Sequence, residues 1–126
     1  MPIPESKMNF TRLLRAIALP TMLVWNTSAL PIQASPEIAS GDGVVNANIT
    51  ACLSRTDTFV STLDVDVEKG QIDRTGYFGD GSFRILCYPN PYGEANQSLV
   101  VIFAAHDTNF EVADSFVQIA ISQIAD

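Results

Sequence analysis

The sequence predicts an α+β domain in which two helices pack on one face of a three-stranded antiparallel sheet. Apolar residues recur at helical spacing from residue 45 onward and again before residue 124. Between these segments lie two short apolar runs joined by a glycine-rich turn, and then a longer run of apolar and β-branched residues. With the order helix, strand, strand, strand, helix, the most economical arrangement places both helices on the same side of the sheet.

Residues 1–34 are expected to lie outside this domain, as a secretory signal peptide. Three basic residues, the last of which is Arg15, precede an apolar run from Ala16 to Trp25, and small and polar residues follow. This is the order of a signal peptide. The alternative is a retained transmembrane helix, which needs about 20 apolar residues. Cleavage after Ala34 or Ala29 is expected, and both Met1 and Met8 remain possible starts.

The remaining chain is divided into a flexible lead-in, residues 35–44, and one domain, residues 45–126. The lead-in is expected to be flexible because it is polar and contains glycine. The first helix is expected over residues 45–63, and Cys52 lies on its apolar face. That face comprises Val45, Ile49, Cys52, Leu53, Phe59, Val60 and Leu63.

Three strands are expected after the first helix, over residues 71–78, 82–88 and 98–105. The turn between the first two is the "GDG" stretch at Gly79–Gly81. In the second strand, Cys87 shares one face with Phe83 and Ile85. The third strand is apolar on both faces. A capping box from Thr108 to Glu111 then starts the final helix, which is expected to run to residue 124.

The two cysteines of residues 35–126, Cys52 and Cys87, are expected to form a disulfide. An exported protein meets an oxidising compartment, and only one pairing is possible. The alternative is a pair of free thiols. Because Cys87 is expected on the helix-facing side of its strand, it can meet Cys52 on the inner side of the first helix.

One face of the sheet is left over, because two helices cover only the other. Leu86, Tyr88, Val100 and Ile102 are predicted to line this uncovered face. A large exposed apolar patch usually marks an interaction site, here for a protein partner or for a second copy of the chain. The alternative is that the lead-in or the loop at 89–97 folds across the patch.

The layout resembles small exported bacterial domains of unknown function, with the order α-β-β-β-α. They carry one cysteine in the first helix and a second late in a strand, here in "SFRILC", followed by an apolar strand and an amphipathic helix. The resemblance covers residues 45–126. It implies the fold and a helix-to-strand disulfide, and it implies no catalytic residues and no cofactor.

The charge of the chain argues against nucleic-acid binding. Residues 35–126 contain four basic and thirteen acidic residues, a net charge of −9. Such a surface repels phosphate backbones and anionic lipids. We therefore expect an exported protein, periplasmic or extracellular, with no nucleic-acid partner and no membrane span in its mature form.

A calcium loop is suggested by "DVDVEKG", in which Asp64, Asp66 and Glu68 alternate with other residues. An EF-hand loop requires glycine at its sixth position and a bidentate acid at its twelfth. Lys69 and Thr75 stand at these two positions. The acids are therefore interpreted as one side of a solvated segment, and calcium stabilisation is kept as an alternative.

The single histidine, His106, is the other candidate for chemistry. It lies beside Asp107 at the end of a predicted strand and close to Glu111, so a small metal-dependent or hydrolytic enzyme is an alternative function. A zinc site normally needs three or four ligands, and no nucleophile motif accompanies the histidine. The sequence thus favours an exported, non-catalytic binding domain.

Overall fold

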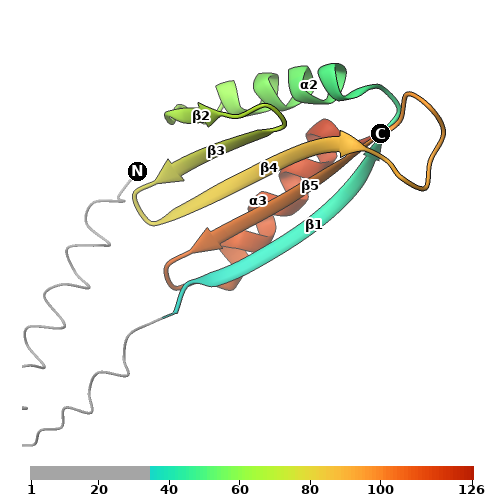
Figure 1. The fold of residues 1–126 in the computed structure, drawn as a ribbon. Helices are drawn as coiled ribbons and strands as arrows, with labels where there is room; N and C mark the ends of the chain where they lie inside the picture. Colours follow the sequence, from blue (N-terminus) through green and yellow to red (C-terminus); the bar gives the residue numbers. More distant parts are fainter. Residues whose placement is uncertain (1–34) are drawn as a thin grey trace, which may run out of the picture.

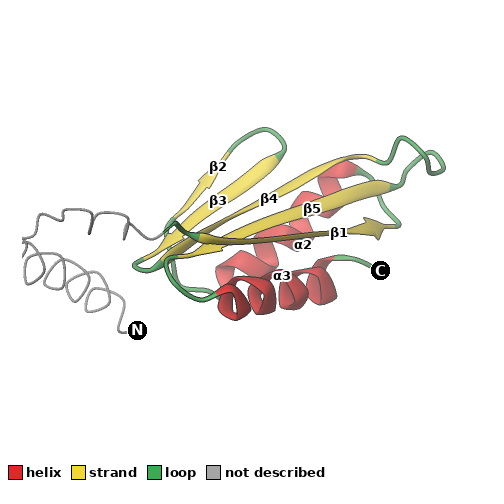
Figure 2. Ribbon diagram, turned by 90° about the horizontal axis from the view of Figure 1, so that it is seen from below, coloured by secondary structure: helices red, strands yellow, loops and turns green. Residues whose placement is uncertain are grey.

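The computed structural model describes residues 35–126, and the predicted signal peptide with its cleavage sites lies outside the described residues. Within residues 35–126, two helices cover one face of a single antiparallel sheet of five strands, and the other face carries no helix (Figures 1 and 2). The predicted α+β class is therefore confirmed. The prediction of three strands is wrong, because two further strands extend the sheet at its edges.

The strand order across the sheet is β1-β5-β4-β3-β2, with every neighbouring pair antiparallel. Along the chain the elements are β1 (Glu37–Val45), α2 (Ile49–Ser61), β2 (Val67–Lys69), β3 (Asp73–Phe78), β4 (Gly81–Pro89), β5 (Ser98–His106) and α3 (Phe110–Ile124).

Strand β1 replaces most of the predicted flexible lead-in. Its nine residues pair with β5 along their whole length, from Glu37 opposite His106 to Val45 opposite Ser98. The glycines that suggested flexibility serve close packing instead. A Cβ added to Gly41 would lie 2.8 Å from Ile121 Cδ1, and one added to Gly43 would lie 2.7 Å from Ala125 Cβ. Only glycine therefore allows α3 to approach β1 this closely.

The first helix begins later than predicted. Val45 is the last residue of β1, and α2 starts at Ile49 with Asn48 as its N-cap, whose side chain accepts a hydrogen bond from the Ala51 N–H. The final helix follows the same pattern. Its N-cap is Asn109 instead of Thr108, and the Asn109 side chain accepts from the N–H groups of Glu111 and Val112. Asparagine is the stronger capping residue at this position.

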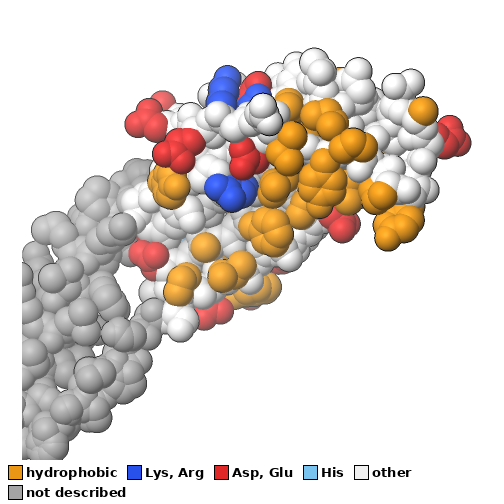
Figure 3. All heavy atoms as spheres, in the orientation of Figure 1, with side chains coloured by type: hydrophobic (Ala, Val, Ile, Leu, Met, Phe, Trp, Pro, Cys, Tyr) orange, Lys and Arg blue, Asp and Glu red, His pale blue; other side chains and the backbone are white. Residues whose placement is uncertain are grey.

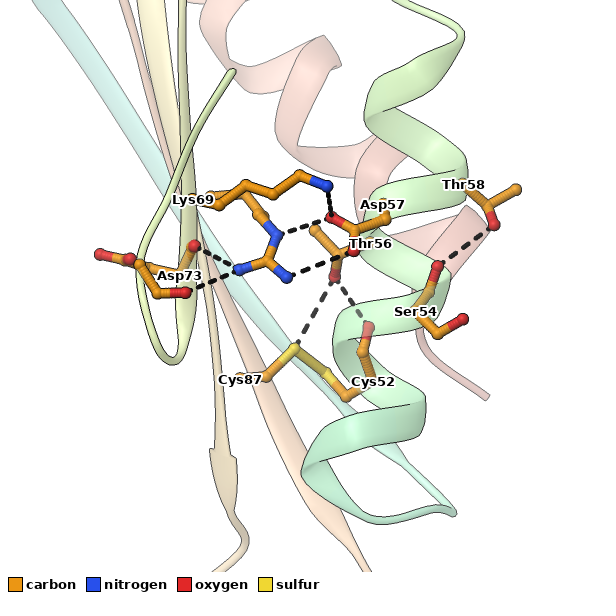
Figure 4. A network of polar contacts seen from close by, with 10 residues as sticks. Cys52, Ser54, Thr56, Asp57, Thr58, Lys69, Asp73 and Cys87 are labelled. Carbon is orange, nitrogen blue, oxygen red and sulfur yellow. Dashed lines mark hydrogen bonds and ion pairs between the residues drawn. A yellow bond between two sulfur atoms is a disulfide. The ribbon is translucent and has the colours of Figure 1, made fainter.

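The disulfide between Cys52 and Cys87 is present and joins α2 to β4 (Figure 4). Both cysteines are fully buried. Thr56, one turn after Cys52, is also buried, and its hydroxyl donates to the Cys52 carbonyl at 2.9 Å. The buried hydroxyl thus has a hydrogen-bond partner within its own helix.

The core lies between the sheet and the two helices. Its centre combines Ile85 of β4 and Ile102 of β5 with Val117 of α3, each fully buried. At one end, the rings of Phe83 and Phe116 stack with their centroids 4.8 Å apart. Among residues 35–126, neither helix has the length and apolar character needed to cross a bilayer.

Candidate functional site

The sheet face opposite the two helices, called the open face below, does not contribute to the core between sheet and helices. The pairing registers identify its residues, because side chains alternate between the two faces of a strand. The open face comprises Ile38, Ser40, Asp42, Val44, Leu99, Val101, Phe103, Ala105, Ser82, Arg84, Leu86, Tyr88, Asp73, Thr75, Tyr77 and Glu68.

The predicted composition of this face is half correct. Leu86 and Tyr88 do lie on the open face, and both are partly exposed. Val100 and Ile102 do not: both are fully buried on the helix side. The register pairs Leu86 with Val101 and Tyr88 with Leu99, so these two residues stand where Val100 and Ile102 were expected.

Nothing in the sequence of β5 reveals this shift. The strand is apolar at both alternating sets of positions, so a displacement by one residue leaves a plausible pattern either way. The one usable signal lies in β4, where Cys87 must face α2 to reach Cys52. Which β5 residues share a face with Cys87 then depends on the register between β4 and β5, and the sequence does not give this register.

An apolar band runs over the middle of the open face. It consists of Val44 on β1, Leu99, Val101 and Phe103 on β5, and Leu86 and Tyr88 on β4. Phe103 is 45% exposed and Val44 is 38% exposed. Figure 3 shows hydrophobic side chains gathered along these strands, with acidic side chains around them. Neither β1 nor the loop after β4 covers the band, since β1 lies in the sheet and the loop projects beyond its end (Figure 1).

Charged groups frame the band. Arg84 is the only cation that residues 35–126 place on the open face. Its Nε lies 3.6 Å from Asp73 Oδ2 and donates to Thr75 Oγ1 at 3.0 Å. Asp42 lies on the other side, on β1, opposite the apolar Val101. The open face therefore offers apolar contact area with uncompensated negative charge toward the β1 edge.

A partly buried ion pair fixes α2 against the hairpin of β2 and β3. Arg74 Nε donates to Asp57 Oδ1 at 2.6 Å and its Nη2 donates to Oδ2 at 3.2 Å, while Nη1 donates to the carbonyls of Gly70 and Asp73. Figure 4 shows Asp57 pointing from α2 to this hairpin, with Lys69 alongside. The hydrogen bond from Arg74 lowers the pKa of Asp57 below its ordinary value.

The three acids proposed for calcium are not brought together. Asp64 and Asp66 line a surface cleft of about 640 Å³, together with Asp57. Asp64 has a φ of 57°, so the expected regular alternation breaks there, and β2 begins only at Val67. Glu68 does not line this cleft and pairs in the sheet with Thr75. The third acid of the cleft, Asp57, already pairs with Arg74 and Lys69.

His106 has a structural position. Its Nδ1 accepts hydrogen bonds from the N–H groups of Thr108 and Asn109, at 3.1 and 2.9 Å, so this nitrogen carries no proton. The proton therefore sits on Nε2, which lies 3.2 Å from Asp80 Oδ2. Both ring nitrogens thus connect β5 to the start of α3 and to the β3–β4 turn. Neither is left for a metal ion or a nucleophile.

Asp107 and Glu111, the two residues proposed to act with His106, have backbone roles in the same turn. The backbone N–H of Asp107 donates to the Asp80 carbonyl, and that of Glu111 donates to the Asn109 side chain. Within residues 35–126, no group of three or more histidine, cysteine or acidic side chains has the geometry to hold a metal ion.

Comparisons with protein-family models, with curated proteins and with solved structures give no match for this chain. The resemblance to small exported bacterial domains therefore stays a prediction.

Proposed function

We propose that the chain is an exported, non-catalytic domain that binds a protein partner, or a second copy of itself, on its open face. One observation carries the proposal: the apolar band lies on one side of the sheet, and the hydrophobic core lies on the other, between the sheet and the two helices. The core on the other side already buries fifteen hydrophobic residues. The band is therefore not needed to fill that core, and an uncovered apolar patch usually serves binding.

Two further features support this function. A buried disulfide is typical of proteins that leave the reducing cytoplasm. The acidic surface argues against nucleic acid as the partner. A metal-dependent or hydrolytic function around His106 lacks a comparable supporting observation, because both ring nitrogens are engaged.

A crosslinking experiment in the native host tests the proposal. A photoreactive amino acid replaces Val101 in the band or, as a control, Ile119, which is 55% exposed on α3. We expect specific crosslinked products from position 101 and none of these from position 119. Adding Leu86→Glu should abolish the products, because a carboxylate in the band must be desolvated on binding.

Circular dichroism then establishes that the Leu86→Glu protein is folded. A folded Leu86→Glu protein that keeps every crosslink from position 101 would contradict the proposed function. The mass of each product distinguishes the two versions of the proposal, since a self-crosslink has twice the mass of the chain.

A further inference from the structure

The outer edge of β1 presents an ordered row of backbone groups. Each residue of a strand directs its N–H and C=O to one neighbouring strand, and successive residues alternate. The Cys87 N–H donates to the Ile72 carbonyl, on the β3 side of β4. Following the registers from there, the backbone N–H and C=O groups of the odd-numbered β1 residues point to β5, and those of the even-numbered residues point away from the sheet. The outward set is Ile38, Ser40, Asp42 and Val44.

Only one end of this edge is covered. Asp126 donates its N–H to the Val44 carbonyl at 2.9 Å, and its carboxylate accepts from the Asn46 N–H at 2.7 Å. No described residue forms a backbone hydrogen bond with the outward groups of Ile38, Ser40 or Asp42. Asp126 is itself held by Arg55, at 3.1 Å. The covered end and the open stretch are thus clearly separated.

The two edges of the sheet differ. The opposite edge is β2, which has only three residues. Natural proteins usually protect an edge by making it short, or by placing lysine or proline on it. Strand β1 has nine residues and contains neither lysine nor proline. It is therefore the edge on which another strand can be added.

The side chains beside the open stretch specify the chemistry of such a strand. Ile38 is 62% exposed, and Asp42 is exposed four residues further on. All four cations of the described residues are already paired with acids. The pairs are Arg55 with Asp126, Lys69 and Arg74 with Asp57, and Arg84 with Asp73. Asp42 therefore has no internal counter-charge.

We propose that β1 accepts an extended segment of another protein as a sixth strand of the sheet. The segment pairs with the outward groups of residues 38–42, and it carries an apolar side chain opposite Ile38 and a lysine or arginine opposite Asp42. These two partner residues are four positions apart, because opposed residues in two strands advance together. This mode of recognition takes its affinity from the main chain and its specificity from alternate side chains.

A second copy of the chain fits this edge less well. In an antiparallel pair of β1 strands centred on Ser40, Asp42 of one protomer would face Ile38 of its partner and gain no cation. The two domains would also approach with net charges of −9 each. The charge pattern therefore selects a basic extended segment over self-association. The inference concerns the edge and does not depend on the open-face function proposed above.

The test uses the full chain, produced by export, and a synthetic ten-residue peptide of alternating threonine and valine. The peptide carries isoleucine and lysine four positions apart, and the matched peptide has glutamate in place of lysine. Hydrogen exchange followed by NMR is the readout. We expect the lysine peptide to protect the amides of Ile38, Ser40 and Asp42, since odd-numbered residues already bond to β5.

Two variants sharpen the test. Ser40→Pro removes an outward N–H without removing a bond to β5, so it should abolish binding. Asp42→Lys should reverse the preference, weakening the lysine peptide about fivefold and strengthening the glutamate peptide by a similar factor. Unchanged preference in folded Asp42→Lys protein would overturn the chemistry that we assign to the partner.

Three other results would overturn the proposal as a whole. These are no binding at millimolar peptide, a peptide-free dimer in sedimentation equilibrium that protects the same amides, and binding that Leu86→Glu abolishes but Ser40→Pro does not. The last result would move the site to the open face, so it would support the proposed function while removing this inference.

Discussion

At the scale of single residues, Asp57 is the acid that pairs with two cations, Arg74 and Lys69. Arg74, only 10% exposed, binds both carboxylate oxygens of Asp57, which is itself 34% exposed. The Arg74 hydrogen bond lowers the Asp57 pKa from 3.8. A group with a lowered folded pKa stabilises the protein fully above its unfolded pKa, and this contribution disappears as the pH falls through the folded value.

We therefore predict that Asp57→Asn lowers the free energy of unfolding at pH 7 by about 1 kcal/mol, a modest value because solvent reaches the carboxylate. The difference from the wild type should begin to shrink below about pH 4, where the carboxylate of the unfolded chain becomes protonated, and should disappear at lower pH, once the folded carboxylate is protonated as well. Urea unfolding between pH 7 and pH 2 measures both quantities. Glu94→Gln, in the exposed loop after β4, is the matched control, and an equal effect from it would refute the special role of Asp57.

At the scale of elements, the contact between α3 and β1 depends on glycine. We predict that Gly41→Ala lowers the free energy of unfolding by about 1–2 kcal/mol, because the new methyl group meets Ile121 and Val117 at 2.8 and 2.9 Å. Ser40→Ala, one residue earlier but on the open face, should have little effect. Thermal unfolding of the two variants checks this, and equal melting temperatures would contradict the packing argument.

The elements differ in how far the sequence alone predicts them. Helix α3 has a clear apolar period and a nearby cap, so its prediction needed no tertiary information. Strand β1 was missed because "SGDG" is typical of a flexible segment, and only α3 lying directly above gives its glycines a packing role. Strand β2 was missed because three residues are too few to show a pattern.

The candidate site was predictable only in part, for a related reason. Cys87 ties the faces of β4 to the disulfide, so Leu86 and Tyr88 were placed correctly on the open face. Strand β5 has no such anchor, and its faces depend on a register set by neighbouring strands. Residues such as Val101 and Phe103, which form the apolar band, could therefore not be distinguished from core residues.

At the scale of the whole molecule, the disulfide is the covalent cross-link between the helix layer and the sheet. Its two cysteines are 35 positions apart. We predict that reduction lowers the free energy of unfolding by about 4 kcal/mol, the chain-entropy value for a loop of this length. Urea unfolding with and without reductant measures the change. A Cys52→Ala, Cys87→Ala variant is the control, because reductant should not affect it, and an unchanged wild-type midpoint would contradict the prediction.

The pairing of β1 with β5 also governs the order in which the molecule can fold. Glu37 pairs with His106, so β1, the first strand in the sequence, can pair only after β5, the last strand, is available. During synthesis, β1 leaves the ribosome before β5 has been made, and closing so long a loop is slow. The hairpin of β3 and β4 can form meanwhile, since its strands adjoin in sequence. Docking of β1 onto β5 is thus expected to be a late event, and until then both β1 and the facing edge of β5 are open to chaperones or to other nascent chains.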